Sequence, residues 1–103
     1  MNTKNKDIQP DMLFDAVLSL KTRAECEAFF KDLCTMSEIH AMVQRLWVAQ
    51  LLKQDMVYSD IVSKTGASSA TISRVSRFLN YGNGGYETVL NRIHSHSEDK
   101  EAR

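Results

Sequence analysis

Tyr-Ser-Asp-Ile-Val-Ser-Lys-Thr-Gly-Ala-Ser-Ser-Ala-Thr-Ile-Ser-Arg-Val-Ser-Arg, residues 58–77, is the most informative stretch of this sequence. It predicts two short helices that meet at a tight turn. Gly66 stands at the turn, where a left-handed backbone costs glycine nothing and other residues about 1 kcal/mol or more. Ser68 stands at the position of an N-cap, where its hydroxyl accepts from free N–H groups of the next helix. We therefore predict a helix-turn-helix over residues 58–79.

The second helix of this motif has one apolar face and one small, basic face. At roughly 100° per residue, Ile72, Val75 and Leu79 share a narrow sector, which we expect to be buried. The opposite face is hydroxylated and basic, and no acidic residue occurs from residue 66 to residue 80. Small side chains let a helix enter the major groove of DNA, where hydroxyls and arginines contact bases and phosphates. DNA binding is the favoured interpretation; the alternative is a solvated helical hairpin in an ordinary all-α domain.

The candidate DNA contacts come from both helices of the motif. They are Ser59, Lys64, Ser68, Ser69, Ala70, Thr71, Ser73, Arg74 and Arg77. The small residues at the start of the second helix are expected to face the groove. Arg74 and Arg77 are expected to hold phosphates or guanine.

Composition limits the other classes of function. With 103 residues the chain is one domain, small enough that an oligomer would help to stabilise it. Its formal net charge of zero excludes a polybasic coat, although a local basic patch is enough for an electrostatic footprint. No apolar run approaches the roughly 20 residues that span a bilayer, and no signal peptide opens the chain. We expect a cytoplasmic protein with no membrane partner.

No sequence pattern predicts a metal site, a cofactor or an enzyme. The two cysteines fit neither a disulfide framework nor a complete zinc ligand set. The glycine-rich loop over residues 82–85 lacks the preceding strand and the glycine spacing of a phosphate loop. Paired carboxylates and nucleophile–base arrangements are not indicated either, so we predict no catalytic residue.

The rest of the chain also predicts helices, because no useful period-2 alternation occurs. Pro10 opens a first helix, and the capping boxes Thr22-x-x-Glu25 and Thr35-x-x-Glu38 start a second and a third. A short last helix follows the glycine-rich loop and ends near Ile93. The predicted organisation is a flexible N-terminus (1–10), a single helical domain (11–94) and a polar, disordered tail (95–103).

The third helix is apolar over more of its circumference than a surface helix should be. Its apolar residues are Ile39, Met42, Val43, Leu46, Trp47, Val48, Leu51 and Leu52. A surface helix shows an apolar stripe over about a third of its circumference. We predict that a second copy of the chain covers the remainder, in a homodimer with interlocked helices; the alternative is burial at the centre of a monomeric bundle.

Two runs of residues resemble the trp repressor family: Leu51-Leu52-Lys53-x-Asp55-Met56 and Gly66-Ala67-x-x-Ala70-Thr71-Ile72-Ser73-Arg74-x-Ser76. The run from Leu79 to Tyr86, Leu-Asn-Tyr-Gly-Asn-Gly-Gly-Tyr, is similar to the YerC/YecD branch. The resemblance covers roughly residues 11–93. It implies an all-α, TrpR-like fold, an intertwined homodimer and a repressor that inserts one recognition helix per subunit into major grooves about 34 Å apart. The alternative is a helical protein-interaction module that kept the fold but does not read DNA.

The same resemblance bears on a small-molecule ligand. Arg74 matches an arginine that lies against tryptophan in the family, whereas Gln44 stands where the family has a second ligand-stacking arginine and Arg45 is its neighbour. The candidate ligand residues are therefore Gln44, Arg45 and Arg74. Val75, however, stands where the family has glycine beside the indole, and overpacking costs about 1–3 kcal/mol. We therefore expect that tryptophan is not the corepressor, and no other effector is indicated. Residues 69–71 and Ser73 match groove-facing positions of the family, whereas Ser59 replaces a base-reading arginine.

Overall fold

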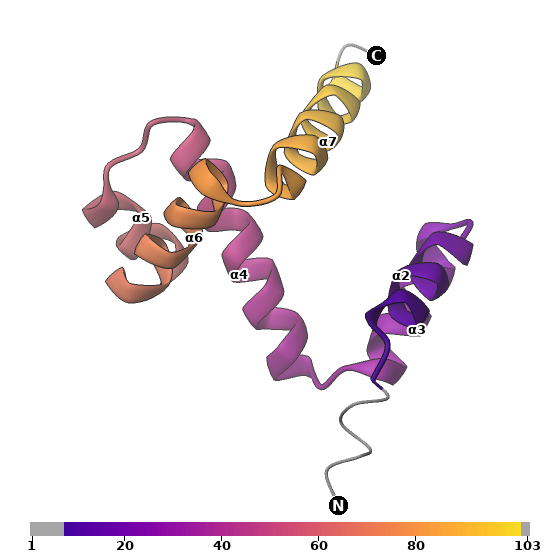
Figure 1. The fold of residues 1–103 in the computed structure, drawn as a ribbon. Helices are drawn as coiled ribbons and strands as arrows, with labels where there is room; N and C mark the ends of the chain where they lie inside the picture. The colour runs from indigo at the N-terminus through magenta and orange to yellow at the C-terminus, as the bar shows by residue number, and fades with distance from the viewer. Residues whose placement is uncertain (1–7, 102–103) are drawn as a thin grey trace, which may run out of the picture. The chain divides into compact units, whose positions relative to one another are not determined.

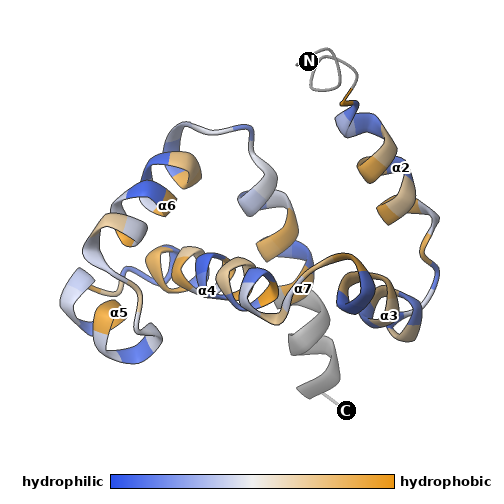
Figure 2. Ribbon diagram, turned by 90° about the horizontal axis from the view of Figure 1, so that it is seen from below, coloured by the Kyte–Doolittle hydropathy of each residue, from blue (hydrophilic) through white to orange (hydrophobic). Residues whose placement is uncertain are grey.

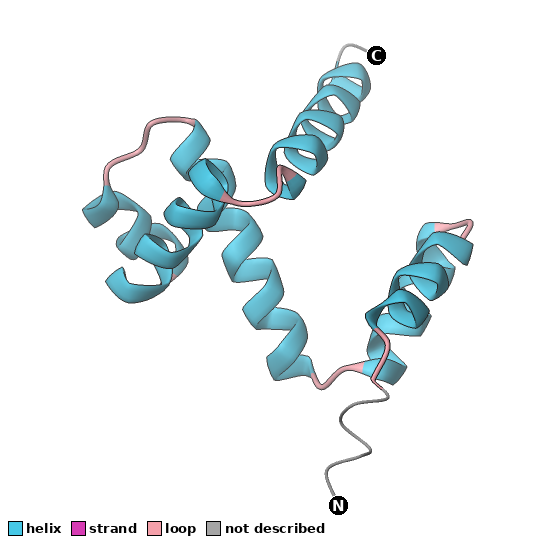
Figure 3. Ribbon diagram, viewed as in Figure 1, coloured by secondary structure: helices cyan, strands magenta, loops and turns pink. Residues whose placement is uncertain are grey.

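The computed structural model describes the backbone of residues 8–101 and the side chains of residues 8–93. These residues form helices and no strand, which confirms the predicted all-α class (Figure 3). The helices are α2 (Pro10–Ser19), α3 (Arg23–Leu33), α4 (Met36–Lys53), α5 (Tyr58–Thr65), α6 (Ser69–Tyr81) and α7 (Gly85–Glu101) (Figure 1). The chain divides into two compact units, Met1–Ile39 and His40–Arg103. None of the described helices is long and apolar enough to cross a membrane.

Capping boxes organise the helix starts of the first unit. Thr22 Oγ1 accepts from the backbone N–H of Glu25 at 3.1 Å, and Glu25 Oε1 accepts from the backbone N–H of Lys21 at 2.9 Å. The pair Thr35 and Glu38 is fully reciprocal, with distances of 3.1 Å and 2.8 Å. The predicted box at Thr35 is therefore complete, whereas at Thr22 the hydroxyl caps α3 as predicted but Glu25 accepts from the N–H of the preceding residue, Lys21. These bonds satisfy free N–H groups at the starts of α3 and α4.

The first unit has little core of its own. Neither α2 nor α3 buries a residue, although both carry apolar side chains. On α2, Met12 and Leu18 are 78 % and 82 % exposed, and Phe14 is 57 % exposed. Figure 2 shows apolar residues recurring along α2 and α4. Within the described part of the first unit, these apolar side chains are therefore not packed into a core.

The core of the protein lies in the second unit. It is built from the C-terminal half of α4 together with α5, α6 and α7. Its buried residues are Val48, Ala49, Leu51, Ile61, Ala67, Ile72, Val75 and Leu90. Only apolar residues are buried among the described side chains, so this core holds no charged or polar group that would need a partner.

The α4–α5 connection ends α4 with two hydrogen bonds of a Schellman motif. The N–H of Met56 donates to the carbonyl of Leu51 at 3.1 Å, and the N–H of Asp55 donates to the carbonyl of Leu52 at 3.0 Å. Asp55 adopts φ 61°, the left-handed conformation that the motif requires. Met56 then packs against the core cluster, so the turn directs the chain back along α4.

The last helix is longer than the sequence predicted. The backbone of α7 is helical through Glu101, whereas residues 95–103 were expected to be a disordered tail. No glycine or proline occurs between residues 86 and 101, so nothing in this stretch breaks the helical backbone. At the other end, residues 1–7 of the predicted flexible N-terminus lie outside the described residues, and Pro10 already belongs to α2.

Candidate nucleic-acid interface

The turn between α5 and α6 is built by Gly66 and its neighbours. Gly66 has φ 74° and ψ 5°, and its N–H donates to the carbonyl of Val62 at 2.9 Å. The hydroxyl of Thr65 donates to the carbonyl of Ile61 at 2.7 Å and accepts from the N–H of Ala67 at 3.1 Å. Ala67 is 2 % exposed, which closes the corner between the two helices. The predicted turn is therefore held by a left-handed glycine and one threonine side chain.

Ser68 caps α6, as the sequence predicted. Its Oγ accepts from the backbone N–H of Thr71 and lies 3.1 Å from the hydroxyl of Thr71. The carbonyl of Ser68 accepts from the N–H of Ile72 at 3.0 Å, so Ser68 satisfies two donors of the first turn. Thr71 is half-buried by this arrangement. Its hydroxyl oxygen accepts from the Ser68 hydroxyl, and a DNA contact by Thr71 stays a prediction.

The rotation of α6 is fixed by its buried ridge. Ile72 and Val75 are 0 % and 1 % exposed and pack in the core with Ile61 of α5. Because these residues face inward, the opposite side of the helix faces outward. All the predicted contact residues except Thr71 are exposed: Ser59, Lys64, Ser68, Ser69, Ala70, Ser73, Arg74 and Arg77. The α6 members of this set form what we call the α6 outer face, residues Ser69, Ala70, Ser73, Arg74 and Arg77.

The α6 outer face is electropositive and has no acidic neighbour at ion-pair distance among the described side chains. The first turn of α6 contains no acidic residue, so its N-terminal partial positive charge is not offset there. The guanidinium of Arg74 lies over the ring of Phe78, with Cζ 5.9 Å from the ring centroid. Such a face combines small side chains, hydroxyls and two cations, which suits contact with a phosphate backbone and base edges.

The three predicted ligand residues line neither of the two cavities described below, and their role stays a prediction. Gln44 is half-buried, and its amide Nε2 donates to the carbonyl of Thr65 at 3.3 Å, which ties α4 to the end of α5. Arg45 is half-buried on α4, and Arg74 is exposed on α6. A cavity of about 410 Å³ nearby is lined by other residues, Leu46, Phe78, Gly82, Asn83, Gly85, Tyr86 and Val89.

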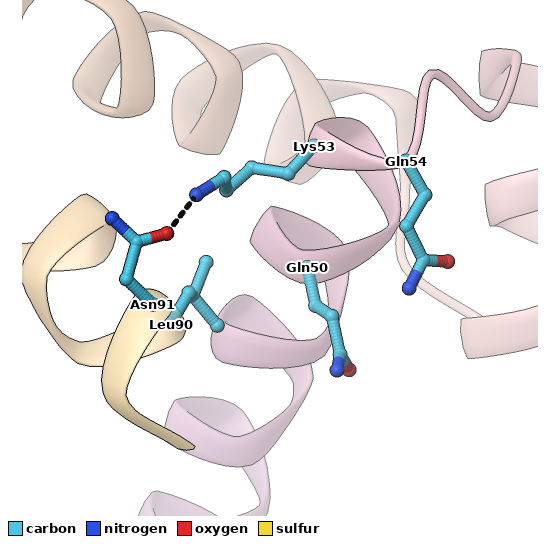
Figure 4. A pocket seen from close by; sticks show the side chains of 5 residues that line it. All are labelled: Gln50, Lys53, Gln54, Leu90 and Asn91. Carbon is cyan, nitrogen blue, oxygen red and sulfur yellow. Dashed lines mark hydrogen bonds between the residues drawn. The ribbon is translucent and has the colours of Figure 1, made fainter. Parts of the chain in front are cut away.

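A second cavity shows a contact that sequence reasoning missed. It measures about 160 Å³ and is lined by Gln50, Lys53, Gln54, Leu90 and Asn91 (Figure 4). Lys53 Nζ donates to Asn91 Oδ1 at 2.8 Å, drawn as the dashed line in Figure 4, and to Glu87 Oε2 at 3.1 Å. This Lys53 clip joins the end of α4 to α7. Its members are more than 30 residues apart, so no local pattern signals it.

Within the described residues, no three His, Cys, Asp or Glu side chains come close enough together to hold a metal ion. The two cysteines, Cys26 and Cys34, are free thiols and half-buried. The α6 outer face, in contrast, presents hydroxyl groups that can donate and accept hydrogen bonds, together with the guanidinium groups of Arg74 and Arg77.

Comparison with known proteins places this geometry in a family. A family model described as Trp repressor protein matches residues 9–94. The chain is 54% identical over 83 residues to the uncharacterized protein YerC of Bacillus subtilis (strain 168), covering 81% of this chain and 80% of YerC.

Two solved structures are similar as well. A crystal structure of a candidate Trp repressor from Staphylococcus aureus has a TM-score of 0.77 and 51% identity, with 82% of this chain and 84% of that chain covered. A TrpR-like protein from Eubacterium eligens ATCC 27750 has a TM-score of 0.78 and 52% identity, with 82% and 87% covered. The predicted resemblance, including its YerC branch, is confirmed.

Proposed function

The chain belongs to the Trp repressor protein family, and from this premise we propose that it is a sequence-specific DNA-binding transcriptional regulator that acts as a homodimer. In this proposal α5 and α6 form its helix-turn-helix, and α6 enters the major groove. It acts in the cytoplasm as a repressor, it is a regulator rather than an enzyme, and it does not need tryptophan.

One observation carries the DNA-binding proposal: the exposed α6 outer face is held outward by a fully buried ridge. Ile72 and Val75 fix the rotation of the helix, so the small and basic residues of the opposite side are exposed. Arg74 and Arg77 supply cations for phosphate or guanine, and Ser69 and Ser73 supply hydroxyls for base edges. In a dimer the two copies of α6 would contact half-sites about 34 Å apart.

The exposed apolar faces support the homodimer. Helices α2 and α3 have 10 and 11 residues and bury none of them. Isolated helices of this length are marginal in water, so they need a tertiary surface to pack against. On α4, Val43 and Trp47 are 55 % and 38 % exposed. A second copy of the chain would cover these faces, because each copy offers the same apolar stripes to the other.

The core packing supports independence from tryptophan. Val75 is 1 % exposed and belongs to the core cluster, so its isopropyl group occupies space that the chain itself fills. The amide Nε2 of Gln44 already donates a hydrogen bond to the carbonyl of Thr65. A ligand entering at this place would have to repack the core, which costs about 1–3 kcal/mol.

Selection of binding sites from random duplex DNA tests the proposed function. The purified chain is incubated with the duplex pool at moderate salt, with and without tryptophan. We expect enrichment of a palindrome with half-sites about one helical turn apart, to the same degree in both conditions. Affinity should fall about a thousandfold or more between 50 and 200 mM salt if the dimer contacts six to ten phosphates.

Replacement of the two arginines separates DNA binding from the alternative of a protein-interaction module. Arg74→Ala with Arg77→Ala should abolish most of the affinity for the selected duplex while leaving thermal stability nearly unchanged, since both side chains are exposed. Arg92→Ala is the matched control, because it removes an exposed arginine from α7 instead of α6. Unchanged DNA affinity in the double variant would refute the assignment of the basic face, and an absence of any duplex binding would favour the interaction module.

A further inference from the structure

We propose that Phe78 is a positioning residue that holds the guanidinium of Arg74 ready for a DNA phosphate. The inference rests on the proposed function and deepens it, because it names what orders one of the two cations of the α6 outer face. The observation behind it is a cation–π contact on the surface of α6, in which Arg74 Cζ lies 5.9 Å from the centroid of the Phe78 ring.

The backbone of α6 places these two side chains together. They lie four positions apart in the helix, so they are neighbours on one side of its surface. Val75, between them in sequence, is 1 % exposed and anchors the helix in the core. The rotation of α6 is therefore set by the core. The helix cannot rotate about its axis, so the positions of Arg74 and Phe78 on its surface are fixed.

Burial does not explain the aromatic ring at this position. Phe78 is 47 % exposed, whereas a phenylalanine that serves the core would be largely covered. One part of the ring lines the apolar cavity with Leu46, Tyr86 and Val89, between α4, α6 and α7. The ring also lies within cation–π distance of the guanidinium. Phe78 thus links a rigid apolar site to a cation on the DNA-facing helix.

The cation–π contact has a consequence for phosphate binding. A free arginine samples many rotamers and loses this freedom when it binds an anion. A guanidinium already held over an aromatic face loses less rotamer freedom on binding. The N–H groups at the edge of the guanidinium remain available to donate to phosphate oxygens. In this arrangement the chain orders Arg74 by itself, without a bound small molecule.

A double-mutant cycle on the full chain tests the inference, with the duplex obtained by selection as the probe. Phe78→Leu keeps apolar volume beside the cavity but removes the ring face. We expect it to weaken DNA binding about two- to fivefold per subunit, the range of an exposed cation–π contact, and by about the square of that factor in a dimer. The slope of affinity against salt should stay the same, because no charge is removed.

The second arm of the cycle places Phe78→Leu in an Arg74→Ala background. There the substitution should have no further effect on DNA affinity, since the cation that the ring orders is gone. With Arg74 present, Phe78→Trp should bind DNA at least as well as the parent chain, unlike Phe78→Leu, because tryptophan gives the strongest cation–π face. Tyr81→Leu is the matched control: Tyr81 is an aromatic of the same helix, 87 % exposed, and should be neutral.

A spectroscopic readout separates failure of the inference from failure of the proposed function. In the DNA-free protein, the Arg74 Nε–H resonance should be displaced by the ring current of Phe78 and should return to the position of a free arginine in Phe78→Leu. An undisplaced resonance would overturn the positioning role of Phe78, and so would an equal loss of DNA affinity on Phe78→Leu with and without Arg74. Duplex binding by the parent chain would still uphold the proposed function in either case. Failure of the parent chain to bind any duplex would overturn both.

Discussion

Replacing Gly66 by alanine should destabilise the protein through its backbone alone. Gly66 has φ 74° and a Cβ placed on it would meet no atom within 4 Å, so sterics against neighbours contribute nothing. An L-residue in the left-handed region costs about 1–2 kcal/mol. Alanine also lowers the conformational entropy of the unfolded chain, which offsets about 0.4–1 kcal/mol of this loss in stability. The net expectation is a loss of about 1 kcal/mol in the free energy of unfolding.

Urea unfolding at one fixed protein concentration measures this loss, because the stability of a dimer depends on concentration. Thermal unfolding should show a decrease in Tm of about 4–8 °C per kcal/mol for a domain of this size. Gly66→Asn is the matched control, since asparagine tolerates the left-handed region and should retain most of the stability. The N–H of residue 66 still donates to Val62 in both variants, so that hydrogen bond does not distinguish them.

Gly82 provides a second comparison for the same reasoning. A Cβ at Gly82 would collide with the carbonyl oxygen of Phe78, which belongs to the backbone and cannot move aside cheaply. Gly82→Ala should therefore cost more than Gly66→Ala, and asparagine should not rescue it. Two results would refute this reasoning: equal losses of stability for Gly66→Ala and Gly82→Ala, or a loss for Gly66→Asn as large as for Gly66→Ala. Either would mean that backbone conformation does not set the cost at position 66 and steric collision the cost at position 82.

Four further outcomes are expected. Ser68→Ala should lower the free energy of unfolding by about 1 kcal/mol by removing the cap of α6, and Ser68→Asp should preserve it. Lys53→Met should lower stability by less than about 1 kcal/mol, with a smaller effect at high salt, because Glu87 is 55 % exposed. Leu18→Glu, at a position 82 % exposed in the single chain, should be nearly neutral in a monomer but should shift sedimentation from dimer to monomer if a second copy covers α2. Calorimetry should show no saturable binding of tryptophan in the micromolar range, and a saturable isotherm would refute the steric argument from Val75.

Much of the local structure was predictable because its causes lie within a few residues. The boxes at Thr22 and Thr35 and the cap at Ser68 are hydrogen bonds between residues three positions apart, so a short pattern contains both partners. The buried ridge of α6 follows from helical periodicity, with Ile72 and Val75 buried and Leu79, predicted in the same sector, only half-buried. The same periodicity indicated the exposed residues on the opposite side of α6.

Other features escaped local reasoning. Asp55 adopts a left-handed conformation, which a sequence pattern usually predicts only at glycine. The Schellman motif at the end of α4 requires this conformation. Composition alone suggested a disordered tail where the backbone of α7 is helical through Glu101. The hydrogen bond from the Gln44 amide to the carbonyl of Thr65 joins residues 21 positions apart, so no local pattern signals it.

The sequence by itself thus determined the helices, the turn at Gly66 and the chemistry of the α6 outer face. These depend on backbone propensity, capping and periodicity, which act between near neighbours in the chain. Only the tertiary structure decided that Lys53 joins α7, that Gln44 is hydrogen-bonded to the end of α5, and that α2 and α3 are left without buried residues. Such contacts join segments distant in sequence, and their partners are known only once packing has brought the helices together.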